Sequence, residues 1–139
     1  MLQWGLQVTP TCLLCNLQVE SRNHLYFDCG FSYDIWTLIA SRSRIIPRRS
    51  WDETIFQMQS LPSEKAFRLL VLLSWQTTLY WLWNERNNRL HSNNFCSVDS
   101  IFSLIDRQIR NKIQSFRYSS PILCSKMMQR WFDLPSTRP

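Results

Sequence analysis

The feature that most constrains this chain is a cluster of three cysteines and one histidine near its N-terminus. Cys12 and Cys15 are separated by two residues, and His24 and Cys29 follow within the next 14. A C-x-x-C turn can direct two sulfurs at one metal ion, and two further ligands complete the tetrahedron that Zn²⁺ prefers. Four protein ligands leave no open coordination position, so we predict one structural Zn²⁺. Such binding contributes on the order of 10 kcal/mol in small domains, enough to fold a segment with little core.

Two other interpretations of the cluster stay open at this point. A thioredoxin-like redox pair also uses C-x-x-C, but no strand precedes the cysteines and no β-α-β pattern comes after them. A chance grouping is the other, because free cysteine is often buried, although the finger-like spacing argues against chance. Cys96, Cys124 and His91 lie far along the chain, and we expect ordinary buried or surface positions for them.

The pattern beyond the cluster predicts a mainly α-helical protein. Only two glycines occur among 139 residues, fewer than a sheet with many tight turns requires. We expect a small irregular zinc-bound module at residues 1–31. Residues 32–139 should form a helical region that packs on it, giving a single domain overall with about four helices, one of them long and central.

Apolar spacing and capping residues predict where these helices begin and end. The long helix is apolar almost all round in its middle, as expected of a helix in the core. The first expected helix is capped by Ser32 and ends before Pro47, and a short second one, capped by Ser50, spans Trp51–Met58. The long helix runs from Ser63 to about Leu90, and a fourth from Ser97 to about Phe116. A short helix after Pro121 should cover the core with Met127, Met128, Trp131 and Phe132.

The net charge of +6 arises entirely in the last third of the chain. Residues 86–130 carry eight basic side chains against two acidic ones, whereas residues 1–85 carry seven of each. A basic segment suits a polyanionic partner such as RNA or DNA, and a solvated helix face explains it equally well. The candidate phosphate contacts are Arg86, Arg89, Arg107, Arg110 and Arg117.

The residues around the cluster also resemble a known family. They are Cys12-Leu13-Leu14-Cys15, the stretch from Glu20 to Cys29, and Phe31-Ser32 followed by Ile35-Trp36. This arrangement is similar to the reverse-transcriptase zinc-binding family (zf-RVT). That family has a C-x-L-C pair, an acidic-Ser-x-x-His-Leu-aromatic-aromatic stretch and a further Cys, followed by Phe-Ser and Trp. The resemblance implies that Cys12, Cys15, His24 and Cys29 are its zinc ligands.

The same resemblance implies an origin. The family lies at the C-terminal end of the polyprotein of plant LINE-type, non-LTR retrotransposons, downstream of the polymerase. The segment Tyr80–Asn87, with Arg89 and His91, is similar to the segment downstream of the zinc module in such elements. The family carries a helical portion before its first cysteine, whereas here only the short segment Leu2–Pro10 precedes Cys12. We therefore expect a module truncated at its N-terminus.

Nothing in the sequence indicates an enzyme. A Gly-rich phosphate loop, a G-x-S-x-G motif and an adjacent aspartate pair are all missing, so we expect no catalysis and no small-molecule substrate. We expect no membrane association, because the longest apolar stretch, Leu69 to Trp83, contains several polar residues and a spanning helix needs about 20 mostly apolar ones. Without a signal peptide, clustered cysteines suggest the nucleus or cytoplasm.

The sequence thus favours a zinc-binding, non-catalytic accessory module that associates with nucleic acid. Two alternatives belong to other classes. One is a zinc-stabilised scaffold that contacts a protein partner or associates with itself through the flank exposed by truncation. The other is a fragment of a decayed element that has no present function.

Overall fold

The computed structural model describes residues 11–92 and 94–132, and in these ranges the chain consists of helices, the connections between them and the N-terminal loops. The mainly α class predicted from the sequence is therefore confirmed. The elements in order are the short π-helix η2 (His24–Asp28) and the α-helices α1 (Gly30–Ser43), α2 (Trp51–Gln59), α3 (Lys65–His91), α4 (Val98–Gln114) and α5 (Pro121–Phe132).

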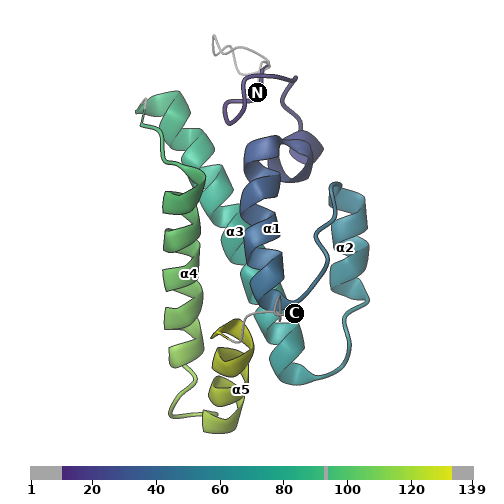
Figure 1. Ribbon diagram of the computed structural model, residues 1–139, viewed down its shortest axis with the longest axis vertical. Helices are drawn as coiled ribbons and strands as arrows, with labels where there is room; N and C mark the ends of the chain where they lie inside the picture. Colours follow the sequence, from purple (N-terminus) through teal and green to yellow (C-terminus); the bar gives the residue numbers. More distant parts are fainter. Residues whose placement is uncertain (1–10, 93, 133–139) are drawn as a thin grey trace, which may run out of the picture.

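The helices form an elongated bundle with a loop-rich module at one end (Figure 1). α1, α3 and α4 run along the long axis and contact one another, and α5 packs against all three at the end opposite the module. α2 lies on the outer side of α1. Among the described residues, no helix combines the length and hydrophobicity needed to cross a bilayer.

Capping explains most of the observed helix limits. The Ser50 and Ser97 side chains accept hydrogen bonds from the backbone amides of Glu53 and Ser100, as predicted. Two predicted caps were wrong. α1 begins two residues before Ser32, with Cys29 as N-cap.

The second wrong cap concerns α3. Its N-cap is Glu64 instead of Ser63, because the Glu64 carboxylate accepts a hydrogen bond from the Phe67 amide at 2.6 Å. The buried Ser32 hydroxyl, for its part, donates to the Leu25 carbonyl and ties α1 to the module.

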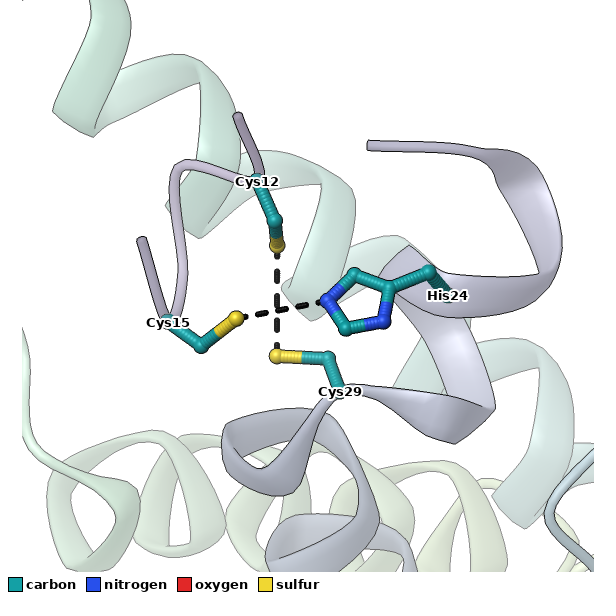
Figure 2. A group of neighbouring side chains, drawn as sticks. All are labelled: Cys12, Cys15, His24 and Cys29. Atoms are coloured by element: carbon teal, nitrogen blue, oxygen red, sulfur yellow. Dashed lines mark hydrogen bonds between the residues drawn. The ribbon is translucent and has the colours of Figure 1, made fainter. Parts of the chain in front are cut away.

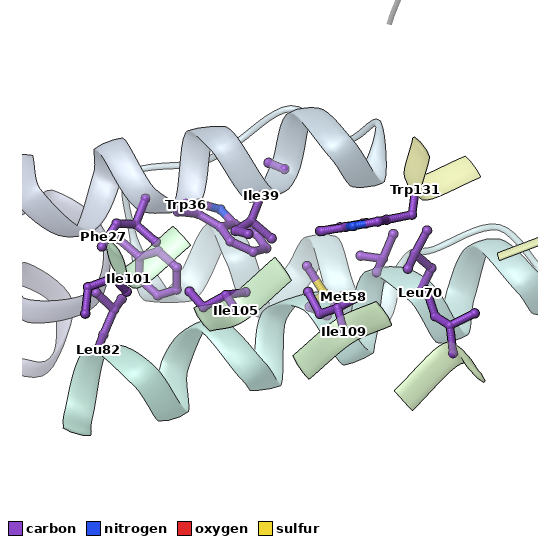
Figure 3. Packing of buried hydrophobic residues seen from close by; sticks show 14 of the residues in the cluster. Phe27, Trp36, Ile39, Met58, Leu70, Leu82, Ile101, Ile105, Ile109 and Trp131 are labelled. Carbon is purple, nitrogen blue, oxygen red and sulfur yellow. The ribbon is translucent and has the colours of Figure 1, made fainter. Parts of the chain in front are cut away.

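One hydrophobic core joins the module to the bundle (Figure 3). Four isoleucines of α4 at helical spacing are at most 1% exposed, and Phe27 of η2 is equally buried. Met127 and Trp131 of α5 are fully buried as predicted, whereas Phe132 is 50% exposed and so does not cover the core. The α4 residues are Ile101, Ile105, Ile109 and Ile113.

α1 ends with an unusual residue choice. Arg44 has a φ of 63°, in the left-handed region, and the Ile45 amide donates to the Ala40 carbonyl at 3.0 Å, which is the bonding pattern of a Schellman motif. Glycine is the usual residue at this position, because a side chain in this conformation costs about 1–2 kcal/mol. The fold therefore carries a strained arginine where glycine would be relaxed.

A buried hydrogen bond fixes α5 on α4. The indole Nε1 of Trp131 donates to Asp106 Oδ1 at 2.7 Å, and Trp131 is 0% exposed. Asp106 also pairs with Arg110 at 3.1 Å. One carboxylate thus satisfies a buried donor and a partly exposed cation.

We predict that Asp106→Ala lowers the free energy of unfolding by about 1–3 kcal/mol, because the buried indole N–H loses its acceptor. Asp106→Asn is the matched control, since its amide oxygen can still accept this bond, and its loss should be clearly smaller. Urea unfolding followed by tryptophan fluorescence measures both. Equal losses in the two variants would contradict the role given to this hydrogen bond.

Candidate zinc centre

The four predicted ligands converge on one point at the end of the bundle (Figure 2). Their ligand atoms all lie within 4.8 Å of one another. Cys12 Sγ is 3.9 Å from Cys29 Sγ, and Cys15 Sγ is 3.3 Å from His24 Nε2. A tetrahedron with Zn–S bonds of about 2.3 Å has sulfur–sulfur edges of about 3.8 Å, and the separation of Cys12 Sγ from Cys29 Sγ matches this edge.

A tight turn presents the first two sulfurs. The Asn16 amide donates to the Cys12 carbonyl at 2.8 Å, the Cys12 amide donates to the Gln18 carbonyl at 2.8 Å, and Asn16 takes a left-handed φ of 59°. A single antiparallel bridge between Thr11 and Val19 closes this loop. The C-x-x-C pair is thus held by backbone hydrogen bonds.

The other two ligands come from η2 and the start of α1. The Ser21 hydroxyl accepts a hydrogen bond from the His24 amide at 3.0 Å, which fixes the turn that carries the imidazole. Asp28 Oδ2 lies 3.4 Å from His24 Nδ1, so the carboxylate orients the ring with Nε2 toward the sulfurs. A carboxylate behind the histidine is a common partner of zinc-binding imidazoles.

The thiol pKa values of Cys12 and Cys29 move in opposite directions, because the two sulfurs share a proton. The hydrogen bond from Cys12 to Cys29, followed by burial, raises the pKa of Cys12. The same bond lowers the pKa of Cys29 to about 5, against burial and with help from the Phe31 and Ser32 amides. Cys29 is the N-cap of α1, where the positive end of the helix favours a thiolate.

The arrangement is that of a structural zinc site. Three sulfurs and one imidazole nitrogen form a closed Cys₃His set, and such a set leaves no position for a reactive water. Cys12, His24 and Cys29 are buried, so the metal lies inside the fold. The expected cofactor, one structural Zn²⁺, fits these residues, and they define a zinc-binding module built onto a helical bundle.

Comparison with known proteins agrees with this class. The family described as zinc-binding in reverse transcriptase (zf-RVT) matches residues 1–36. The resemblance predicted from the sequence is confirmed for this segment, which matches that family and contains all four predicted ligands. No curated protein and no solved structure matches the chain.

The structure gives Arg86 and Arg89, two of the predicted phosphate contacts, roles inside the fold. Arg86 is 3% exposed and pairs with Glu20 Oε1 at 3.0 Å. Arg89 Nη1 donates to the Leu13 and Leu14 carbonyls, at 3.2 and 2.9 Å, between the first two zinc ligands. As placed, these guanidinium groups are not available to an external phosphate.

Glu85 completes this network and was missed in the sequence. It is 1% exposed, and its Oε2 accepts from Arg89 Nε at 2.7 Å and from the Cys96 amide at 2.9 Å. The end of α3 thereby holds both the C-x-x-C turn and the loop before α4. The four-residue spacing of Glu85 and Arg89 was a readable signal of an ion pair on a helix.

The remaining sequence candidates lie elsewhere. Arg107 and Arg117 are exposed, and Arg110 pairs with Asp106. Arg117 lies beyond the end of α4, in the turn before α5, where Nη2 donates to the Tyr118 hydroxyl at 3.0 Å. The cysteines and the histidine outside the cluster do not join it, as expected: Cys96 is half-buried, Cys124 is buried and His91 is exposed.

We predict that Asp28→Ala lowers zinc affinity about 10- to 100-fold, the usual effect of losing the partner of a ligating histidine. Asp34→Ala removes an exposed carboxylate from α1 and is the matched control. Competition with a chelating dye measures both affinities. Equal affinities for the two variants would show that Asp28 does not orient the imidazole.

Proposed function

We propose that this chain is a non-catalytic accessory module of a reverse transcriptase, derived from a LINE-type retrotransposon of plants, that associates with RNA or DNA. The observation that carries the proposal is the match of residues 1–36 to a zinc-binding domain found in reverse transcriptase. The substrates of such an enzyme are nucleic acids, so an accessory domain that binds the same polymers would hold them near the polymerase.

The closed zinc site supports a non-catalytic role. Its four protein ligands come from the module itself, and zinc activates water only where a coordination position stays open. On this proposal the metal fixes the loops of residues 11–29, and the exposed cations of the bundle make the contacts with phosphates.

Exposed basic residues in the second half of α4 and just after it are available for such contacts. Arg107 and Lys112 of α4 and Arg117 of the following turn are exposed, and the Arg117 guanidinium lies 4.8 Å from the Tyr118 ring. Exposed guanidinium groups neutralise phosphates and release counterions, so binding through them weakens steeply with salt.

The test is a salt titration of binding by fluorescence anisotropy, with labelled single- and double-stranded oligonucleotides. For two or three phosphate contacts, the logarithm of the affinity should fall linearly with the logarithm of the salt concentration, with a slope of about −1.4 to −2.7. Arg107→Glu should weaken binding to both kinds of strand and make the slope shallower by about 1. The absence of binding at low salt, or binding indifferent to salt, would contradict the proposal.

A scaffold role is the second candidate, and one observation favours it. Tyr80 and Trp83 of α3 are 57% and 43% exposed, so the outer side of this helix is partly apolar and suits a protein partner or a second copy. Sedimentation equilibrium separates this candidate from the first. A concentration-dependent dimer that Trp83→Ala abolishes, together with no nucleic-acid binding, would favour the scaffold.

A further inference from the structure

Three cations gather at the end of the bundle opposite the zinc module. Arg44 at the end of α1, together with Lys126 and Arg130 of α5, lines a hollow of about 490 Å³, which Glu64 and Phe67 also line at the start of α3. The residues that line this basic hollow come from the end of α1, the start of α3 and α5, and these elements meet at the end of the bundle opposite the zinc module (Figure 1). Only Lys126 and Arg130 belong to the basic last third of the sequence.

The charges of the basic hollow favour an anion. Three cations face one carboxylate, and that carboxylate, Glu64, is engaged in capping α3 through the Phe67 amide at 2.6 Å. The N-terminus of α3 itself adds the positive end of a 27-residue helix. Arg44 and Arg130 line the same hollow, and burial followed by the neighbouring charge of Arg44 lowers the pKa of Arg130.

One cation is held in position by its contacts, and another sits on a constrained backbone. Arg130 Nε donates to the Ser43 carbonyl at 3.2 Å, and its guanidinium lies 4.1 Å from the Phe67 ring centre. Arg44 occupies the left-handed position where glycine would be relaxed. Strain at one residue is a sign that its side chain serves a purpose beyond folding, and this side chain lines the hollow.

An apolar hollow adjoins the basic one. It has a volume of about 780 Å³ and shares Arg44, Pro62 and Phe67 with the basic hollow. Ile46 and Phe56 in its wall are each 69% exposed. Asp52 and Glu53 line it together with Arg44 and Arg48, so its charges balance and give a phosphate no net attraction there, whereas an uncharged base can stack on the Phe56 ring.

We propose that the two hollows together bind one strand of single-stranded nucleic acid, with a phosphodiester between Arg44, Lys126 and Arg130 and an unstacked base against Phe56. The inference rests on the proposed function and goes further, because it names the surface and the kind of strand. A duplex keeps its bases stacked and paired, so it meets the cations but does not fill the apolar hollow.

The experiment compares four variants of the zinc-loaded protein, using a labelled single-stranded oligonucleotide of about 12 nucleotides, which spans typical site sizes, and the duplex of the same sequence. Lys126→Glu and Phe56→Ala should each lower single-strand affinity about tenfold or more. Phe56→Ala should leave duplex affinity within about twofold, since stacking on an aromatic ring needs an unpaired base. Arg107→Glu makes the same charge change as Lys126→Glu on another helix and should lower single-strand and duplex affinity alike.

Arg44→Gly separates a loss of binding from a loss of folding. Glycine relaxes the left-handed backbone, so this variant should keep or raise the thermal midpoint of the protein while losing single-strand affinity. The proposal is overturned if Lys126→Glu and Arg44→Gly weaken single-strand binding no more than Arg107→Glu does, or if Phe56→Ala has no effect. Failure of the wild type to bind either oligonucleotide would instead overturn the proposed function, and this inference with it.

Discussion

Convergence of three sulfurs and one imidazole on a single point is the constraint on which the N-terminal part of this fold depends. Residues 11–29 contain one bridge, one tight turn and a five-residue π-helix, and such elements do not fold by themselves. Without the metal, the buried thiols of Cys12 and Cys29 would be joined only by a weak hydrogen bond. With it, the loops acquire a fixed centre, and Leu25 and Phe27 are placed against the core.

The site is joined to the bundle by charges as well as by apolar packing. Glu85, Arg86 and Arg89 at the end of α3 hold Glu20 and the carbonyls of the C-x-x-C turn. Breaking a buried ion pair leaves an uncompensated charge, so these residues fix the position of the module on the helix. α3 thus connects the zinc centre to the basic hollow at its other end.

The sequence predicted the local features. The zinc ligands follow from spacing, and α2 and α4 follow from Ser50, Ser97 and apolar periodicity. It placed the caps of α1 and α3 wrongly. Glu64 takes the Phe67 amide in place of Ser63, and α1 already begins at Gly30, after Cys29, without a side-chain cap, while the Ser32 hydroxyl bonds to the Leu25 carbonyl. It also assigned Arg86 and Arg89 to phosphates, because the charge of an arginine is visible in a sequence and its burial against Glu20 or Glu85, which depends on tertiary packing, is not.

The clustering of Arg44 with Lys126 and Arg130 was hidden for the same reason. More than 80 residues separate Arg44 from the two cations of α5, and only the packing of α5 against α1 and α3 brings them to one hollow. A count of charges along the chain locates the excess in the last third and does not show which cations share a surface.

X-ray absorption at the zinc edge of the purified protein is the sharpest test of the Cys₃His centre. We predict one zinc per chain, with three sulfur neighbours at about 2.3 Å and one nitrogen at about 2.0 Å. A folded protein without zinc, or a zinc spectrum dominated by oxygen and nitrogen neighbours, would contradict this assignment.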